Sequence, residues 1–377
     1  MHVGMTVIFQ NPDGIDGDPR RDAETYDLEY GMADRAEALG FDSLWSVEHH
    51  FNGYAVCPDP LAFLHYFAGR TKHIRLGTMV TVLPWHDPVR LAEASSVLDH
   101  ISGGRNILGV GRGVAKLEFD GFGLDMGQSR QKLIEATQAI QMGLETGYIE
   151  LDGEVVKQRR VQIRPFPKHS FTDRMYGSAS SPETFSIFAK LGIGLLLIPG
   201  GKPWSDVIKL VAEYRREFRE VHGREAPKPI FVGWTFVDED ADRARAIGMD
   251  LIARYSLSAL AHYDFGGEHM RGLRGYESYV AMSEAAAAAG STTEDFIEGF
   301  AREHVYGTPD ACYERIRELR ADLDASAFLG VFSYAGMSAA EAVRNQELFA
   351  AKVLPRLKAL EPGIGIDMPE PLAIAAE

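Results

Sequence analysis

Short apolar runs alternate along the chain with longer amphipathic stretches. The first run, residues 3–9, carries β-branched residues and precedes a loop rich in Gly, Asp and Pro. Residues 27–39 then repeat apolar positions at helical spacing and end at Gly40, a residue type that often terminates helices. This pattern predicts a strand, a loop and a helix.

The same alternation continues to the end of the patterned region. The further predicted strands cover residues 43–47, 74–82, 106–111, 175–178, 194–198, 230–237 and 327–333, and the helices after them cover 58–69, 88–101, 129–146, 182–191, 203–222, a stretch from about 239, and 339–357. Eight strand–helix units are typical of a (β/α)8 barrel. An open doubly wound sheet uses similar buried strands, so periodicity alone does not exclude it. Eight consecutive units favour the barrel, and we predict an α/β fold of the (β/α)8 TIM-barrel class.

Two stretches interrupt this regularity. Residues from about 148 to 170 are charged and rich in strand-forming residues, whereas residues from about 261 to 300 begin glycine-rich and polar. A long glycine-rich insertion is either an active-site lid or a surface excursion. We therefore predict one barrel domain over residues 1–360 with insertions at these two places, followed by a weakly patterned tail, residues 361–377.

Composition narrows the classes of partner. The chain has 377 residues and a formal net charge of −15, which disfavours nucleic acid and anionic membrane surfaces. Its two cysteines, Cys57 and Cys312, show no metal-binding spacing and are interpreted as packing residues of a reducing compartment. We see no signal peptide and no apolar run long enough to span a membrane, so we expect a cytoplasmic protein that binds small molecules.

Barrels of this class carry their active sites at the carboxyl ends of the strands, so the polar residues that follow each apolar run are the candidates. The second strand delivers Glu48, His49 and His50, and the fourth delivers Arg112 within the segment GVGRGVAK. The fifth is followed by three serines, Ser178, Ser180 and Ser181. All of these residues fall on one rim of the predicted barrel.

The serines and the arginine allow two interpretations. Ser181 before Pro182 is a good N-cap and first-turn pair, which alone predicts only a capped helix. Alternatively, the hydroxyls and free N–H groups form an anion cradle, with Arg112 as a bidentate phosphate ligand. The glycines around Arg112 do not match the GxGxxG pattern of dinucleotide-binding loops. The close approach of a flat ring system to the backbone would explain these glycines equally well.

The two histidines are adjacent, and neighbouring residues on a strand point to opposite faces. His49 and His50 are therefore not expected to share a metal ion, and we predict no metal site. Each imidazole is either a structural group or a general base or hydrogen-bond donor near neutral pH. Glu48 can orient an imidazole or pair with a basic side chain.

Six blocks in order carry a family resemblance: EHHF, LGTMVTVLPWHDPVRLAE, LDHISGGRNILGVGRG, FGLDMGQSR, GSASSPET and VYGTPDACYERI. They resemble the bacterial luciferase-like flavin monooxygenases over residues 3 to 358, least between 150 and 172 and between 223 and 300. The family implies a barrel that binds reduced FMN from a separate NAD(P)H:flavin reductase. It captures O2 as a flavin C4a-peroxide and oxygenates an organic substrate, an aliphatic aldehyde in the light-emitting members.

The resemblance also assigns residues. His49 matches the catalytic histidine beside the flavin, with Glu48 and His50 next to it. At or near the phosphate site, the resemblance matches Arg112, Val114 and the turn Ser178, Ala179, Ser180 and Ser181. Under the isoalloxazine ring it matches Thr78, Met79 and Val80, with a cis peptide between Met79 and Val80. It also matches Glu93 to a buried acid on the following helix. The insertion that begins at about residue 261 corresponds to the mobile loop of the family's catalytic subunits. The family also favours dimers, so we expect a homodimer.

The chain departs from the light-emitting members at several positions. Gly177 replaces an acid, Gly111 replaces a reactive cysteine, and Val114 with Ala115 replaces a bulkier pair. We therefore expect a monooxygenase without useful light emission that acts on an aldehyde, ketone or other small apolar molecule. Two alternatives remain: a deazaflavin (F420)-dependent dehydrogenase, whose acidic cofactor tail should need more basic residues than Arg112, and a non-catalytic flavin-binding protein.

Overall fold

The computed structural model describes residues 1–200, 202–265, 267–360 and 372. Within these residues, parallel strands close into a barrel in chain order: β1 (His2–Val7), β2 (Ser43–Ser46), β3 (Arg75–Thr78), β5 (Asn106–Gly111), β8 (Met175–Ser178), β9 (Gly194–Leu197), β10 (Ile230–Val237) and β12 (Ala327–Val331). Strand β12 pairs with both β10 and β1, so the sheet has no open end there. The predicted (β/α)8 TIM barrel is confirmed, and the open doubly wound sheet is wrong.

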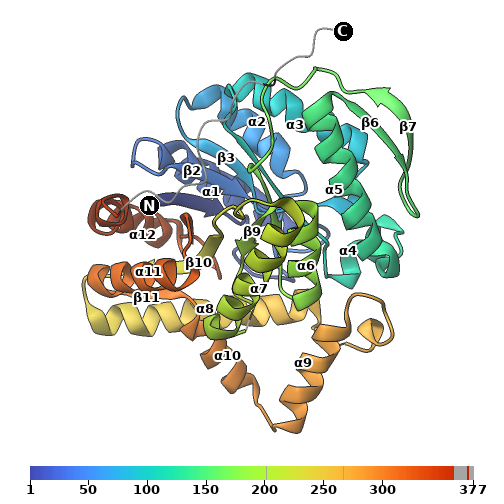
Figure 1. The fold of residues 1–377 in the computed structure, drawn as a ribbon. Helices are drawn as coiled ribbons and strands as arrows, with labels where there is room; N and C mark the ends of the chain where they lie inside the picture. The colour runs from blue at the N-terminus through green and yellow to red at the C-terminus, as the bar shows by residue number, and fades with distance from the viewer. Residues whose placement is uncertain (201, 266, 361–371, 373–377) are drawn as a thin grey trace.

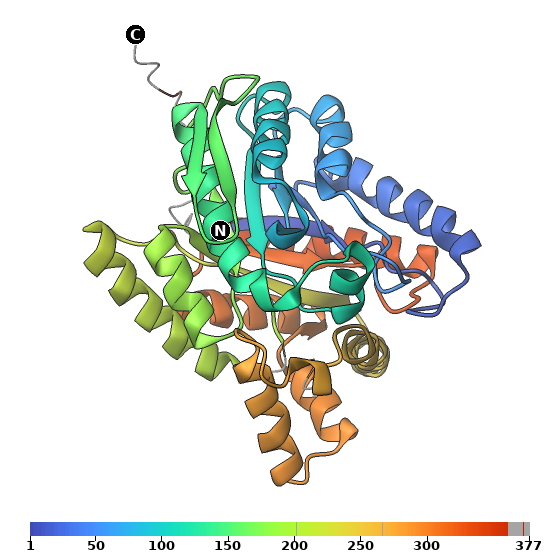
Figure 2. The ribbon, with the colours of Figure 1, turned by 90° about the vertical axis from the view of Figure 1, so that its right-hand side faces the viewer.

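Helices surround the barrel (Figures 1 and 2). They are α1 (Asp22–Ala36), α2 (Pro60–Arg70), α3 (Pro88–Ser102), α4 (Lys116–Phe122), α5 (Ser129–Thr146), α6 (Pro182–Leu191), α7 (Trp204–His222), α8 (Ala241–Tyr263), α11 (Pro309–Leu323), α12 (Ala339–Lys352) and α13 (Leu354–Lys358). Short 3-10 turns lie at η1 (Pro19–Arg21), η2 (Leu83–Trp85), η3 (Met126–Gln128) and η4 (Glu268–Met270). No helix in the described part of the chain combines the length and the apolar character that a membrane span needs.

The two insertions lie at opposite ends of the molecule in both views (Figures 1 and 2). The first is an antiparallel hairpin of β6 (Tyr148–Asp152) and β7 (Lys157–Gln162). The second adds α9 (Glu277–Ala288) and α10 (Thr293–Arg302), which project below the barrel, and is followed by the short strand β11 (Val305–Gly307) beside β10. The predicted tail, residues 361–377, lies outside the described residues except for residue 372.

Three elements differ from the sequence-based expectation. The third apolar run is divided into β3 and β4 (Thr81–Val82) by a cis peptide between Met79 and Val80, at the predicted position. Helix α4 follows the glycine-rich segment GVGRGVAK, between the strand predicted at 106–111 and the helix predicted at 129–146, where we predicted no element. Helix α8 continues to Tyr263 and so carries its last residues into the region predicted as an insertion.

Large side chains fill the barrel wall because small residues stand opposite them. Trp45 on β2 is fully buried, and a Cβ at Gly77 on the neighbouring strand would lie 2.3 Å from its ring. Glycine at position 77 therefore makes room for the indole, which donates its N–H to Ser43 Oγ at 2.7 Å. Cys57 and Cys312 are buried and unbridged, as expected of packing residues.

One buried acid predicts how stability depends on pH. Glu29 on α1 is 2% exposed, and burial raises the pKa of its carboxyl to about 8 despite hydrogen bonds from Ser333 and the Phe9 N–H. When the pKa of an acid is higher in the folded protein than in the unfolded chain, the protein loses stability as the pH rises. For Glu29 this loss runs from the unfolded-state pKa of 4.5 to the folded-state pKa of about 8. Glu29→Gln should therefore stabilise the protein by about 1–3 kcal/mol at pH ~9 and hardly at all at pH ~4.5. Thermal unfolding of both proteins at the two pH values measures this; an equal gain at both would contradict it.

Candidate active site

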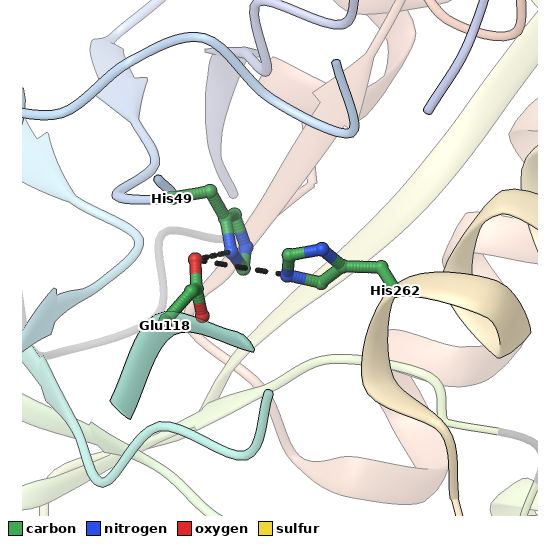
Figure 3. Close-up of side chains that lie close together, drawn as sticks. All are labelled: His49, Glu118 and His262. Atoms are coloured by element: carbon green, nitrogen blue, oxygen red, sulfur yellow. Dashed lines mark hydrogen bonds and ion pairs between the residues drawn. The ribbon is translucent and has the colours of Figure 1, made fainter. Parts of the chain in front are cut away.

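Three side chains from distant parts of the chain meet at the carboxyl-terminal end of the barrel strands. Glu118 of α4 lies between His49, which follows β2, and His262, in the last turn of α8 (Figure 3). Its Oε1 lies 3.0 Å from His49 Nδ1 and 3.6 Å from His262 Nε2. The Glu118 side chain is 1% exposed and the His49 side chain 15% exposed. Both line the first cavity described below, and of the three residues His49 alone also lines the second.

Local structure holds the carboxylate and imidazole in place. The backbone N–H of His50 donates to the same Glu118 oxygen at 2.9 Å, and the His49 N–H donates to Cys57 O at 3.1 Å. Glu118 stands in the first turn of α4, where the positive end of the helix favours a negative charge. Burial alone would raise the pKa of Glu118, but His49 and His262 outweigh it and lower that pKa to about 2. Glu118 is therefore an ionised carboxylate at neutral pH.

An ionised carboxylate only accepts hydrogen bonds, so the facing nitrogen of His49, Nδ1, carries a proton. In the neutral imidazole the other nitrogen, Nε2, is then an acceptor, and the Tyr263 hydroxyl lies 3.2 Å from it. Burial raises the pKa of Tyr263 well above its usual value, so the phenol stays protonated and donates a hydrogen bond to His49 Nε2. The result is a carboxylate–imidazole–phenol chain.

His49, Glu118 and His262 also place three potential metal ligands within 4.8 Å of one another. The hydrogen bonds around His262 argue against that use. Asn52 Oδ1 accepts the Tyr54 N–H at 3.1 Å, so the Asn52 amide nitrogen faces His262 Nδ1, also at 3.1 Å. His262 Nδ1 is thus an acceptor, and Nε2, which faces Glu118, carries the proton. Burial lowers the pKa of His262, which keeps it neutral. One hydrogen bond joins His49 to Glu118 and another joins His262 to Asn52, and the absence of a metal site stays our prediction.

Glu48 and His50 support the site from one side. Glu48 accepts from the Val82 N–H and from His86 Nε2, both at 2.7 Å, and lies 3.3 Å from His50 Nε2. Burial would raise the pKa of Glu48, but these partners lower it overall. The His50 ring packs edge-on against Trp85. These contacts connect the end of β2 to β4 and η2, which is a structural role. The catalytic assignment of Glu48 and His50 stays a prediction.

A cavity of about 130 Å³ opens beside this cluster. Its lining contains most of the residues predicted to contact a cofactor: Met79, Val80, Arg112, Val114, Ser178 and Ser180, together with Glu48, His49, Glu118 and Thr184. Thr78 is fully buried just before the cis peptide and donates its hydroxyl to Gly109 O at 2.7 Å. Glu93 is different: it is only partly buried, and it accepts the Arg164 N–H at 3.2 Å near the hairpin. The expectation that Glu93 is a buried acid is wrong.

Arg112 has a second arginine as its neighbour. A Cβ at Gly275 would lie 2.6 Å from Arg112 Nη1 and 3.1 Å from Arg130 Nε, so both guanidinium groups border this glycine, whose φ is +105°. Arg112 donates to Gly275 O at 2.5 Å and lies over the Tyr276 ring at 4.1 Å. Arg130 Nε is buried without a hydrogen-bond partner in the described chain. Sequence reasoning did not assign Arg130 to the site, although Arg130 is the last residue of the block FGLDMGQSR that carries the resemblance.

The turn after β8 bears out one of the two interpretations that we left open. Ser181 caps α6, its hydroxyl accepting the Thr184 N–H at 3.4 Å and lying 2.9 Å from Thr184 Oγ1. Ser180 lies 2.7 Å from the Tyr279 hydroxyl of the insertion. Helix α6 is capped as predicted, and the anion cradle at this turn stays a prediction. Ala179 lines the second cavity.

The residues present fit the phosphate and ring of a flavin nucleotide. The observation is Arg112 in the wall of a cavity that also contains the apolar Met79, Val80 and Val114. The buried Arg130 Nε, which has no hydrogen-bond partner among the described residues, lies across Gly275 from Arg112, outside the lining of the cavity. A phosphate satisfies paired guanidinium groups, and a flat ring packs on apolar surface.

A second cavity of about 190 Å³ adjoins the first and shares His49, Met79, Val114, Ser178 and Tyr263 with it. Helix α8 and the insertion supply much of its remaining wall, including Tyr255, Phe265, Tyr279, Phe296 and Phe300. His49 and Tyr263 therefore stand at the boundary between a cavity that contains Arg112 and a cavity with many aromatic side chains in its walls.

Comparisons with known proteins agree with this geometry. The sequence model of the luciferase-like monooxygenase family matches residues 1–326. The alkanal monooxygenase alpha chain of the Kryptophanaron alfredi symbiont is 27% identical over 340 residues, which cover 87% of this chain and 91% of that protein.

Solved structures share the fold. The oxygenating constituent of 3,6-diketocamphane monooxygenase from Pseudomonas putida, in complex with FMN, superposes with a TM-score of 0.70 at 18% identity and covers 96% of this chain and 99% of its own. An F420-dependent secondary alcohol dehydrogenase superposes with a TM-score of 0.67 at 16% identity, covering 94% and 98% of the two chains. The barrel, the site at its carboxyl-terminal end and the family match over most of the sequence lead to one conclusion: this chain belongs to the luciferase-like monooxygenase family.

Proposed function

We propose that the protein is an FMN-dependent monooxygenase that uses reduced FMN and O2 to oxygenate a small apolar molecule, such as an aldehyde or ketone, without useful light emission. The observation that carries this proposal is the pair of adjoining cavities with His49 and Tyr263 at their boundary. One cavity offers cations and apolar surface to a flavin nucleotide, and the other offers an apolar space to a substrate.

The chain's own residues provide the binding positions. Arg112 and Arg130 would hold the phosphate together with the α6 N-terminus, and Met79, Val80 and Val114 would pack against the ring. When bound, the reduced flavin supplies the electrons that activate O2 for transfer of one oxygen atom. Aromatic side chains of the insertion cover the second cavity and so keep water from the reacting atoms.

His49 handles the proton. Its Nε2 lone pair accepts the Tyr263 hydroxyl, while its Nδ1–H is fixed on Glu118. If Nε2 takes up a proton, the resulting imidazolium lies directly against the ionised Glu118, which stabilises the positive charge. His49 can thus accept a proton at the boundary of the two cavities and return it to the same place, with Tyr263 as the adjoining donor.

Partners follow from the same proposal. Reduced FMN would come from a separate NAD(P)H:flavin reductase, because the described residues contain no GxGxxG loop for a nicotinamide cofactor. We further propose a cytoplasmic homodimer.

The proposal is tested by oxygen labelling. The purified protein, a flavin reductase, FMN and NADH are incubated under ¹⁸O2 with a panel of aldehydes and ketones, and products are analysed by mass spectrometry. We expect one ¹⁸O atom per product molecule, dependent on the protein. Products without label in every case would overturn the monooxygenase assignment.

The F420-dependent alternative needs a separate experiment. The sequence offers Arg112 as the single cation for the phosphate end, but in the structure Arg130 lies beside Arg112, so a shortage of cations does not exclude F420. Reduced FMN and reduced F420 should therefore be titrated in parallel under anaerobic conditions. We expect tighter binding of FMN; preferential binding of F420 together with oxygen-independent hydride transfer would favour the dehydrogenase.

Replacing Tyr263 by phenylalanine tests the proton chain. The variant keeps the ring but removes the hydroxyl that donates to His49, so we expect a loss of product yield of about tenfold, equivalent to one hydrogen bond, with FMN affinity unchanged. Tyr306→Phe is the matched control, since the Tyr306 hydroxyl contacts Met249 rather than a residue of the site. Product yield and H2O2 release are measured across pH. An unchanged yield and pH profile in Tyr263→Phe would remove Tyr263 from the mechanism.

A further inference from the structure

We infer that the second cavity selects a substrate built on one ring or two fused rings that carries a hydrogen-bond acceptor for the indole N–H of Trp234. This inference rests on the proposed function, and it names the class of molecule within the broad range of aldehydes and ketones.

Aromatic side chains form a large part of the walls of the cavity. Its lining includes Tyr54, Trp234, Tyr255, Tyr263, Phe265, Tyr279, Phe296 and Phe300, with Ile8, Val47, Ala55 and Ala259 among the aliphatic members. Flat rings gain from edge-to-face and offset contacts with such walls. A flexible alkyl chain gains less from them and loses rotational freedom when it is confined. The lining therefore favours rings over chains.

The size of the cavity agrees with this choice. It measures about 190 Å³. An apolar cavity of about 150 Å³ in another protein holds one benzene molecule. The present cavity is thus suited to a substituted single ring or a compact bicyclic molecule, whereas a ten-carbon chain would have to fold to enter it.

The walls are also held in place by contacts among themselves. Trp234 and Tyr255 have ring centroids 4.4 Å apart, and Tyr54 lies stacked on His262 at 4.3 Å with an interplanar angle of 11°. His304 packs edge-on against the Trp234 ring at 5.0 Å, and its Nδ1 accepts the Trp234 backbone N–H at 3.4 Å. The cavity is therefore shaped before any substrate arrives, which favours a rigid ligand.

Among the aromatic side chains of the walls, one polar atom has no partner in the described chain. The hydroxyls of Tyr54 and Tyr255 pair with each other at 2.6 Å, and the Tyr263 hydroxyl pairs with His49. In contrast, Trp234 Nε1 is buried and has no hydrogen-bond partner among the described residues. An indole nitrogen can only donate, and a buried donor without an acceptor is unfavourable. A carbonyl or ether oxygen of a bound ring would satisfy it and fix the orientation of that ring relative to His49.

The test compares three probes on the purified protein, without flavin or reductase, by isothermal titration. The probes are 1-tetralone, a fused bicyclic ketone; tetralin, the same skeleton without the oxygen; and decanal, a linear aldehyde. We expect 1-tetralone to bind about tenfold more tightly than tetralin, the effect of one hydrogen bond, and more tightly than decanal. Tighter binding of decanal, or equal affinity for 1-tetralone and tetralin, would overturn the inference.

Two matched variants locate the donor. Trp234→Phe keeps an aromatic ring but removes the N–H, so the preference for 1-tetralone over tetralin should fall to about twofold or less. Trp85→Phe makes the same change in the cofactor cavity, where another indole nitrogen is buried without a partner, and should leave the preference intact. Loss of the preference in Trp85→Phe alone would place the ketone in the wrong cavity and contradict the inference. If Trp234→Phe does not fold, the three-probe comparison on the unaltered protein still decides.

Binding without turnover separates this inference from the proposed function. A protein that prefers 1-tetralone but never incorporates oxygen would retain the ring-binding cavity and overturn the monooxygenase assignment. A protein that oxygenates decanal and binds no ring compound would support the monooxygenase assignment and overturn the inference about the ring-binding cavity.

Discussion

His49→Ala is expected to lower the yield of oxygenated product by about 10²–10⁴-fold, the usual contribution of a positioned acid–base group. The imidazole is the part of the carboxylate–imidazole–phenol chain that can gain and lose a proton at the cavity boundary. Reduced FMN should still bind, because the cationic residues Arg112 and Arg130 stay in place. Reducing equivalents that no longer reach product should appear as H2O2.

The measurement is the ratio of product to H2O2 per molecule of NADH oxidised, with FMN affinity determined in parallel. His73→Ala is the matched control, since His73 is an exposed histidine between α2 and β3. Full product yield in His49→Ala would reduce His49 to a structural imidazole. A parallel loss of FMN binding would instead show that the side chain holds the cofactor.

Arg112→Ala is expected to weaken FMN binding by about 10–100-fold, because a charge-assisted hydrogen bond contributes about 1.5–3 kcal/mol. Riboflavin, which has the same ring without the phosphate, should bind the variant and the unaltered protein nearly equally. The comparison also accounts for the contacts of Arg112 with Gly275 and Tyr276, since loosening the insertion would affect both ligands.

Fluorescence titration with both flavins provides the measurement, and Arg90→Ala, an exposed arginine on α3, provides the control. Equal weakening of FMN and riboflavin would remove Arg112 from the phosphate site. Arg130→Ala should show the same selectivity for FMN if the two guanidinium groups share the phosphate.

Elements with strong local signals could be predicted from the sequence. Helix α5 covers Ser129–Thr146 and stops at Gly147, which adopts a left-handed conformation, and α6 begins at Pro182 behind its Ser181 cap, both at the predicted residues. Counting strands also placed His49, Arg112 and the serine turn on one rim, and the structure has them around adjoining cavities.

The missed residues depend on contacts that no local pattern announces. Glu118 lies on the short helix α4, whose GRGVAKLEF surroundings resemble a loop. Tyr263 reaches His49 from a position 214 residues away. Arg130 becomes part of the site only because Gly275 of the insertion approaches it. Glu93 was expected as a buried acid on resemblance alone, and the structure leaves it only partly buried beside Arg164.

Stopped-flow spectroscopy of the protein with photoreduced FMN and O2, without any organic substrate, tests the central claim most directly. If the site binds reduced flavin and protects its reaction with oxygen from water, an absorbing species distinct from both reduced and oxidised FMN should form and then decay with release of H2O2. His49→Ala, recorded alongside, would show whether the imidazole governs that decay. Direct conversion of reduced to oxidised FMN at the rate seen in free solution, with no such species, would contradict the account.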